Sequence, residues 1–255
     1  MSEESKLKKQ WEKTQSAWDD TDFLLNRANA FMKKRWAKLN NNIVDIVGKE
    51  VVAKNEYINL LDIGAGRGDF YKNIQNLVKK YTGIEPSEKM LKNEIFEEDF
   101  ILKRGKGEDL ADEQMYDVVL IKEVLDHCYA PEKVIGNAFR ALKQGGIIII
   151  SLTNKDAYYK KLFKTYAAKL VDTHKDHLYN FNPKEILELL QTAGFTLEKT
   201  MATNYLRLPF IVENLVGKLP QGIVFGILDF TDRVGNVFMK NEGGSFIITA
   251  RKNSF

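Results

Sequence analysis

Residues 60–70 constrain this chain more than any other stretch, because an apolar run leads through an acid into three glycines at alternate positions. The segment reads LLDIGAGRGDF, and sequence compatible with a helix follows it. Glycine permits positive φ and lets the backbone approach a ligand with no Cβ in the way. The pattern therefore predicts a buried strand that turns sharply beneath a nucleotide-like ligand. The spacing is GxGxG rather than the GxGxxG of dinucleotide-binding folds, so the ligand itself stays open at this point.

Strand and helix patterns alternate around this loop. Residues 131–142 read as a helix that begins at a proline, and residues 146–152 as an unalternating apolar strand of a sheet covered on both faces. Alternation of this kind predicts a parallel sheet with right-handed crossovers. Strands are expected at 57–62, 80–84, 99–103, 116–121, 146–152, 195–202 and 245–251. The other helices are expected at 68–78, 87–96 and 183–193.

Two parts of the chain depart from this alternation and define the expected domain organisation. Residues 1–55 read as a helical N-terminal extension or cap, and residues 56–255 as the main domain with its core at 57–153. Insertions at about 154–182 and 203–240 interrupt the second half and are expected to act as lids. A length of 255 residues with a hydrophobic fraction of 44% is enough for one large domain with a full core.

Charge and cysteine content exclude several classes of protein. The 38 basic and 35 acidic residues give a formal net charge of +3, too small to indicate nucleic-acid binding. Cys128 is the only cysteine, so no intrachain disulfide forms and a reducing cytoplasm is the expected location. The N-terminus has no apolar core typical of a secretory signal, and no apolar run approaches the length of a membrane span.

Polar residues follow several strands at the edge where the glycine loop lies. Glu85 ends the second strand, where a carboxylate can accept hydrogen bonds from both hydroxyls of a ribose. The third strand leads into an acidic loop, GKGEDL at 105–110, whose carboxylates can accept from an exocyclic amine of adenine. The fourth strand leads into KEVLDHC at 122–128. Carboxyl ends of parallel strands meet at one edge, so these segments are expected to converge on one pocket.

These motifs, in this order, resemble those of a class I S-adenosylmethionine-dependent methyltransferase of the small-molecule type. LLDIGAGRG resembles the first motif of the family, YTGIEPSEKML the second, and GKGEDL the adenine loop. YDVVLIKEVLDHC and FRALKQGGIIIISL resemble the motifs of the fourth and fifth strands, and HLYNFNPKEILELLQTAGF a stretch often found after them. The resemblance implies an α/β, Rossmann-like fold: a mostly parallel seven-stranded sheet flanked by helices, with the last strand antiparallel.

The resemblance also implies S-adenosylmethionine as cofactor, S-adenosylhomocysteine as product, and a set of binding residues. The glycines would pass under the methionine part, Asp62 would fix the loop or reach the amine, and Glu85 would bind the ribose. Lys122 and Glu123 would act mainly through their backbone. The full set is Asp62, Gly64, Ala65, Gly66, Gly68, Glu85, Pro86, Gly107, Glu108, Asp109, Lys122 and Glu123.

His127 is the candidate general base, and Asp126 is the alternative. Both follow the fourth strand at the pocket edge, and an unperturbed imidazole titrates near neutral pH. His127, Cys128, His174 and His177 have no fixed mutual geometry in the sequence, so no metal site is predicted.

The acceptor is expected to be a small molecule, methylated most simply on oxygen. Aromatic residues in both insertions suggest a partly apolar acceptor, and lysines among them suggest an anionic one. Three alternatives stay open: methylation of RNA or protein, a non-catalytic module that binds S-adenosylmethionine or S-adenosylhomocysteine, and a dehydrogenase. The GxGxG spacing and the acidic loop disfavour the dehydrogenase.

Overall fold

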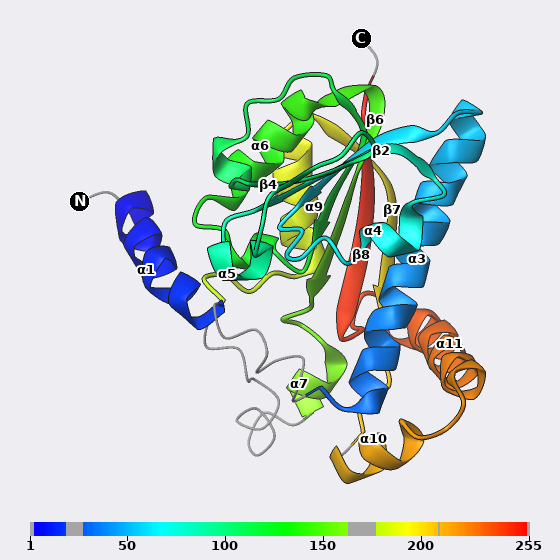
Figure 1. Cartoon of the computed structure of the whole chain (residues 1–255). Helices are drawn as coiled ribbons and strands as arrows, with labels where there is room; N and C mark the ends of the chain where they lie inside the picture. The colour runs from blue at the N-terminus through cyan, green and yellow to red at the C-terminus, as the bar shows by residue number, and fades with distance from the viewer. Residues whose placement is uncertain (1–2, 19–27, 163–176, 209, 254–255) are drawn as a thin grey trace.

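The computed structural model describes residues 3–18, 28–162, 177–208 and 210–253, and places one mixed sheet at the centre of the molecule (Figure 1). The strands are β1 Ile58–Ile63, β2 Val78–Glu85, β3 Ile95–Phe96, β4 Phe100–Arg104, β5 Tyr116–Lys122, β6 Leu142–Thr153, β7 Phe195–Thr203 and β8 Ser245–Lys252. The helices are α1 Glu3–Trp18, α3 Ala30–Lys54, α4 Tyr71–Ile74, α5 Glu88–Leu91, α6 Pro131–Ala141, α7 Tyr158–Leu162, α9 Pro183–Thr192, α10 Phe210–Val216 and α11 Gln221–Phe238. Single 3-10 turns are η1 Gly107–Asp109 and η2 Leu125–His127.

The strand order across the sheet is β3-β4-β2-β1-β5-β6-β8-β7. Strands β4, β2, β1, β5 and β6 pair in parallel, whereas β8 runs antiparallel to both β6 and β7. All seven expected strands form, and β3 is an additional two-residue strand antiparallel to β4 at the edge. The Rossmann-like α/β fold with an antiparallel last strand is thus confirmed.

Helices cover both faces of the sheet and bury its apolar residues. On one face α6 and α9 contribute Val134 and Ile186, and on the other α3 contributes Ile43 and Val47, all with no measurable exposure. The apolar run 147–150 of β6 lies between these two layers and is at most 2% exposed. Burial on both faces explains why this strand is uniformly apolar instead of alternating.

Several helix ends follow from local sequence, but two helices are shorter than expected. Pro131 begins α6, and Asn182 forms a capping box with Glu185 at the start of α9. Ser87 caps α5 by accepting from the Met90 amide. The helices expected at 68–78 and 87–96 are single turns, because β2 already begins at Val78 and residue 92 adopts φ of +57°.

The remaining helices surround the carboxyl edge of the parallel strands (Figure 1). Trp11 of α1 packs edge-on against Tyr129, with ring centroids 5.8 Å apart. Helices α10 and α11 pack on α3, which is itself a layer of the core. The division at residue 55 therefore stays a prediction. The lid role of the insertions at 154–182 and 203–240 also stays a prediction, and residues 163–176 lie outside the described part.

Candidate functional site

Three glycines turn the chain sharply at the carboxyl end of β1. Gly64, Gly66 and Gly68 have φ of +77°, +58° and +73°, which residues with a Cβ adopt rarely. A Cβ on Gly64 would lie 2.4 Å from Val124 Cγ2, so the loop packs directly against the segment after β5. The loop therefore turns sharply at the edge of the sheet and packs closely on neighbouring side chains, and the sharp turn is what its sequence predicts.

Glu85 joins this loop to the end of β2. Its carboxylate accepts from the Gly66 amide at 3.0 Å and from the Ser87 amide at 2.9 Å, one on each oxygen, and the partly exposed Pro86 lies between. Burial raises the pKa of Glu85, and the two amides oppose that rise. A carboxylate has about four acceptor sites, so this group can still accept from two further hydroxyls.

Three other loop amides donate to backbone carbonyls within the protein. Gly64 and Ala65 both donate to the Ile84 carbonyl, at 2.8 and 3.0 Å, and Gly68 donates to the Ala65 carbonyl at 2.9 Å. The following helix, α4, is one turn long. Pyrophosphate binding needs amides directed at the ligand and a helix N-terminus behind them. This geometry disfavours a dinucleotide and suits a ligand without phosphate.

The acidic loop after β4 places its two carboxylates in opposite environments. Glu108 is 3% exposed and accepts from the Tyr129 amide at 2.9 Å, whereas Asp109 is exposed. Asn137 of α6 donates to the carbonyls of Gly107 and Glu108, at 2.9 Å each, and fixes the turn. Glu108 thus holds the loop in place, and Asp109 is the carboxylate that can reach a ligand.

Asp62 is a carboxylate buried beneath the glycine loop. Its Oδ2 accepts from the Tyr81 hydroxyl at 2.5 Å, and its side chain is shielded from solvent. Burial raises the pKa of Asp62 to about 6, against the opposing effects of the Lys122 charge and the Tyr81 hydrogen bond. Lys122, at the end of β5, also contacts Asn40 of α3 at 3.3 Å. A cation placed beside Asp62 would stabilise its charged form.

The segment after β5 brings Asp126, His127 and His177 together. His177 Nδ1 lies 3.2 Å from Asp126 Oδ2, and His127 Nε2 lies 3.8 Å from Asp126 Oδ1. The two imidazole rings meet edge-on, with centroids 4.5 Å apart. The amides of Leu178 and Tyr179 donate to the Asp126 carbonyl, which fixes His177 beside this segment. Both imidazole side chains remain partly accessible, at 16% and 12% exposure.

Comparisons with known proteins agree on one family. A model described as a methyltransferase domain matches residues 28–200. An uncharacterised protein of Methanocaldococcus jannaschii is 31% identical over 199 residues, or 75% of this chain and 81% of that protein. A ubiquinone biosynthesis O-methyltransferase of Maricaulis maris is 25% identical over 74% of this chain and 78% of that one. A solved SAM-dependent methyltransferase of Thermotoga maritima aligns over 87% and 94% of the two chains, with TM-score 0.53 and 19% identity.

The chain belongs to the class I S-adenosylmethionine-dependent methyltransferases. Its match to the family model includes α3, the glycine loop, Glu85 and the segment after β5. The methyltransferase is therefore an enzyme that uses S-adenosylmethionine and releases S-adenosylhomocysteine. Among the described helices of the methyltransferase, none combines the length and the apolar character that a membrane crossing requires.

The same histidine cluster has the donor set of a metal site. One atom each from Asp126, His127 and His177 lie within 4.8 Å of one another. Two imidazoles and a carboxylate are a ligand set that suits several divalent transition metals. The sequence did not predict that His177 would lie beside Asp126. His174 lies outside the described residues. Experiments on this cluster in the methyltransferase therefore need a chelator control.

Glu123 provides a test of how this edge of the site affects stability. Its backbone has φ of +54° and its amide donates to the Ser151 carbonyl at 2.9 Å, while Oε2 accepts from Thr153 at 3.2 Å. Burial, followed by the Asp126 charge, raises the pKa of Glu123 to about 7 from an ordinary value of 4.5. Between pH 4.5 and pH 7, Glu123 therefore keeps its proton in the folded methyltransferase and loses it in the unfolded chain.

This linkage makes the ionised Glu123 unfavourable for folding above neutral pH. Its cost to stability grows as pH rises from about 4.5 to 7 and is fully present above that window, on the order of 1–3 kcal/mol. Glu123→Gln is expected to match the wild type in thermal unfolding at pH 5 and to exceed it at pH 8. The exposed Glu97→Gln serves as control. An equal difference at both pH values would contradict the burial effect.

Several contacts of the site were not apparent in the sequence. Tyr81 supports Asp62 from the start of the second motif, and Lys106 lies 4.5 Å above the Trp11 ring of α1. The aromatic side chain of Trp11 gave no signal beyond helical spacing, which is equally typical of a core residue. These residues join the site only because the fold brings distant segments together.

Proposed function

We propose that this methyltransferase transfers the methyl group of S-adenosylmethionine to an oxygen atom of a small-molecule acceptor. The observation that carries the proposal is the cluster of Asp126, His127 and His177 at the carboxyl edge of the sheet. A hydroxyl must lose its proton when it is methylated, and an imidazole supported by a carboxylate is suited to take it. A neutral amine needs no such base to begin its attack.

The donor is assigned to the edge formed by the first three motifs. In this proposal Glu85 accepts from the ribose hydroxyls, and Gly64, Ala65, Gly66 and Gly68 form the surface beneath the methionine part. The buried Asp62 faces the amine, whose positive charge compensates its desolvation. Asp109 takes the adenine amine, with Pro86, Gly107, Glu108, Lys122 and Glu123 shaping the walls through packing and backbone.

His127 is assigned as the base, with Asp126 and His177 as positioning residues. When bound, the donor supplies an activated methyl group on a sulfonium. The group held by Glu85, Asp62 and the glycine loop would supply this methyl to the acceptor oxygen and would leave as the neutral thioether. The acceptor proton passes to the His127 imidazole. Orientation of the two reactants can supply about 7–11 kcal/mol of the barrier reduction.

Relatives support oxygen as the acceptor atom, since the Maricaulis maris protein is named as a ubiquinone biosynthesis O-methyltransferase. The net charge of +3 gives no support to an RNA acceptor. Methylation of RNA or protein, and a non-catalytic donor-binding role, are the outcomes that an assay must separate from the proposal.

An unbiased transfer assay can test the proposal. The methyltransferase is incubated with S-adenosylmethionine labelled in the methyl group and with separated small-molecule, RNA and protein fractions of a cell extract. We expect label in the small-molecule fraction, on an oxygen atom as identified by product mass spectrometry. Excess S-adenosylhomocysteine should suppress it, whereas added chelator should not.

Other outcomes of this assay would contradict the proposal in distinct ways. Label on nitrogen would remove the need for a base, and label in RNA or protein would replace the acceptor class. Loss of transfer on chelation, with recovery on adding a divalent metal, would assign the histidine cluster to a metal. Donor binding by calorimetry with no transfer into any fraction would favour the non-catalytic role.

A further inference from the structure

Two arginines and a tyrosine lie beyond the carboxyl edge of the sheet, on the side opposite the adenine loop. Arg35 lies on α3, five residues before Asn40, which contacts Lys122 at the end of β5. At 1.5 Å per residue, Arg35 therefore extends about 7.5 Å past that edge. Arg207 follows the end of β7, and Tyr159 belongs to α7, which follows β6. All three residues therefore lie beyond the same edge of the sheet.

The two guanidinium groups have hydrogen-bond donors that the described protein does not use. Arg207 Nη2 donates to the Tyr159 hydroxyl at 3.2 Å, and the Arg207 guanidinium lies 5.0 Å from the Tyr159 ring centre. Among the described residues, no hydrogen-bond partner exists for Nε of Arg207 or for Nε and Nη1 of Arg35, and all three atoms are buried. Buried donors of this kind destabilise the protein unless a partner arrives.

Arg35 has one weak ion pair and a cationic neighbour. Its Nη1 has a long ion pair with Glu213, at 3.7 Å, and Asn29 donates to the other Glu213 oxygen at 3.1 Å. Burial, followed by the Arg207 charge, lowers the pKa of Arg35 to about 10, against the opposing effects of Glu213 and Asp232. The ionised guanidinium of Arg35 is therefore poorly stabilised within the protein.

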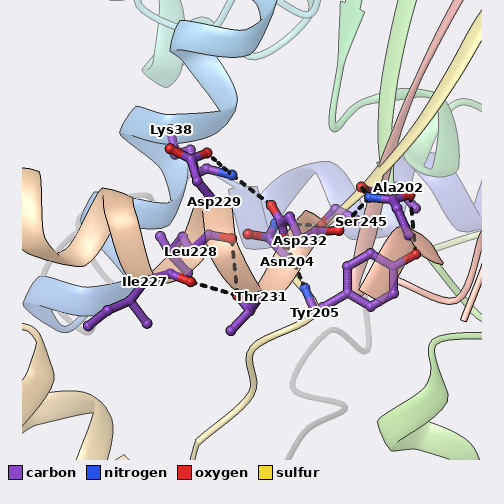
Figure 2. A network of polar contacts seen from close by, with 11 residues as sticks. Lys38, Ala202, Asn204, Tyr205, Ile227, Leu228, Asp229, Thr231, Asp232 and Ser245 are labelled. Carbon is purple, nitrogen blue, oxygen red and sulfur yellow. Dashed lines mark hydrogen bonds and ion pairs between the residues drawn. The ribbon is translucent and has the colours of Figure 1, made fainter. Parts of the chain in front are cut away.

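The nearest other carboxylates are committed elsewhere. Lys38 contacts Asp232 at 2.7 Å and Asp229 at 3.0 Å, and Asp232 also accepts from the Tyr205 amide at 3.1 Å (Figure 2). This network joins α3 to α11 and to the segment that carries Arg207. It holds the two arginines in place, and its two carboxylates exceed the single charge of Lys38 by one negative charge. Arg35, Arg207 and Lys38 are therefore balanced in number by Glu213, Asp229 and Asp232.

We propose that Arg35 and Arg207, with the Tyr159 hydroxyl, bind an anionic group of the acceptor, a carboxylate or a phosphate. The inference rests on the proposed function, because it specifies a chemical group of the acceptor that binds at the same site. The planar guanidinium presents paired donors that match both anions, and buried guanidinium donors without partners favour a group that supplies charged acceptors. Arg207 is partly exposed, whereas Arg35 is only 5% exposed.

Binding of simple probes to the complete chain tests this inference without knowledge of the acceptor. Phenyl phosphate, benzoate and phenol are titrated by calorimetry into the protein saturated with S-adenosylhomocysteine. We expect one or both anions to bind at least tenfold more tightly than phenol. Comparison of the affinities for phenyl phosphate and benzoate decides which anion is preferred. Arg207→Gln should weaken the preferred anion by about 10–100-fold. The matched control is Arg233→Gln, an exposed arginine of α11.

Equal binding of phenol and both anions, or equal anion affinity in Arg207→Gln and wild type, would overturn the inference. Tyr159→Phe removes only a hydroxyl and should weaken the anion by severalfold, which keeps the test decisive if Arg207→Gln does not fold. The affinity for S-adenosylhomocysteine should stay unchanged in each variant. Failure of the O-methylation proposal would appear as a different methylated product, whereas failure of this inference appears only in anion binding.

Discussion

Replacing His127 with alanine is expected to slow methyl transfer by about 10²–10⁴-fold, because the acceptor hydroxyl loses the group that takes its proton. The affinity for S-adenosylmethionine should stay within about threefold, since His127 belongs to the segment after β5 and not to the assigned donor residues. Single-turnover transfer and calorimetry measure the two quantities separately. Unchanged turnover in His127→Ala would remove His127 from the mechanism.

Variants of the residues beside His127 distinguish the general base from a residue that positions it. His177 lies within hydrogen-bond distance of Asp126, at 3.2 Å, whereas the contact of His127 with Asp126 is longer, at 3.8 Å. Asp126→Asn and His177→Ala should therefore lower turnover less than His127→Ala and leave some pH-dependent activity. If His177→Ala abolishes turnover while His127→Ala does not, the base is the Asp126–His177 pair. Asp45→Asn, an exposed change on α3, serves as control.

The second large effect is expected for Glu85→Ala, which should weaken S-adenosylmethionine binding by about 100-fold. The variant loses the acceptors for two ribose hydroxyls and also the anchors of the Gly66 and Ser87 amides. Hydrogen bonds to a charged group contribute about 1.5–3 kcal/mol each, which accounts for this magnitude. Calorimetry with S-adenosylmethionine and S-adenosylhomocysteine measures it, and both ligands should weaken equally because they share the ribose.

Glu88→Ala is the matched control, because it removes an exposed carboxylate three residues further on that pairs with Arg104. Its donor affinity should remain within twofold of the wild type. Wild-type affinity in Glu85→Ala would contradict the ribose assignment, and the structural role of Glu85 in holding the loop would then stand alone. Thermal unfolding of both variants reports whether the loop itself has been disturbed.

Much of the sheet could be predicted from local patterns. The apolar runs 118–121 of β5 and 147–150 of β6 are uniformly buried, and their period differs clearly from that of the flanking helices. The lengths of the helices after β1 and β2 could not be predicted in the same way. The chain from Gly68 to Val78 has helix-compatible residues, yet its single helical turn ends at Ile74, and pairing with β1 draws Val78 into β2. Tertiary pairing overrides helix propensity there.

Within the candidate site, the sequence identified which residue types meet but not which atoms are available. Glu108 and Asp109 are adjacent acids in one loop, and only their burial assigns one to the Tyr129 amide and the other to solvent. The same holds for the residues around the candidate base. Asp126 and His127 are neighbours in sequence, whereas His177 reaches them through the amides of Leu178 and Tyr179.

Periodicity and backbone freedom, which adjacent residues set, were enough to predict the α/β fold, the glycine turn after β1 and the family. The three-dimensional structure was needed to show that the Gly64, Ala65 and Gly68 amides donate to backbone carbonyls, that His177 contacts Asp126, and that guanidinium donors of Arg35 and Arg207 are buried. Those properties depend on distances between segments far apart in the chain, and on the burial that makes an unpaired donor costly.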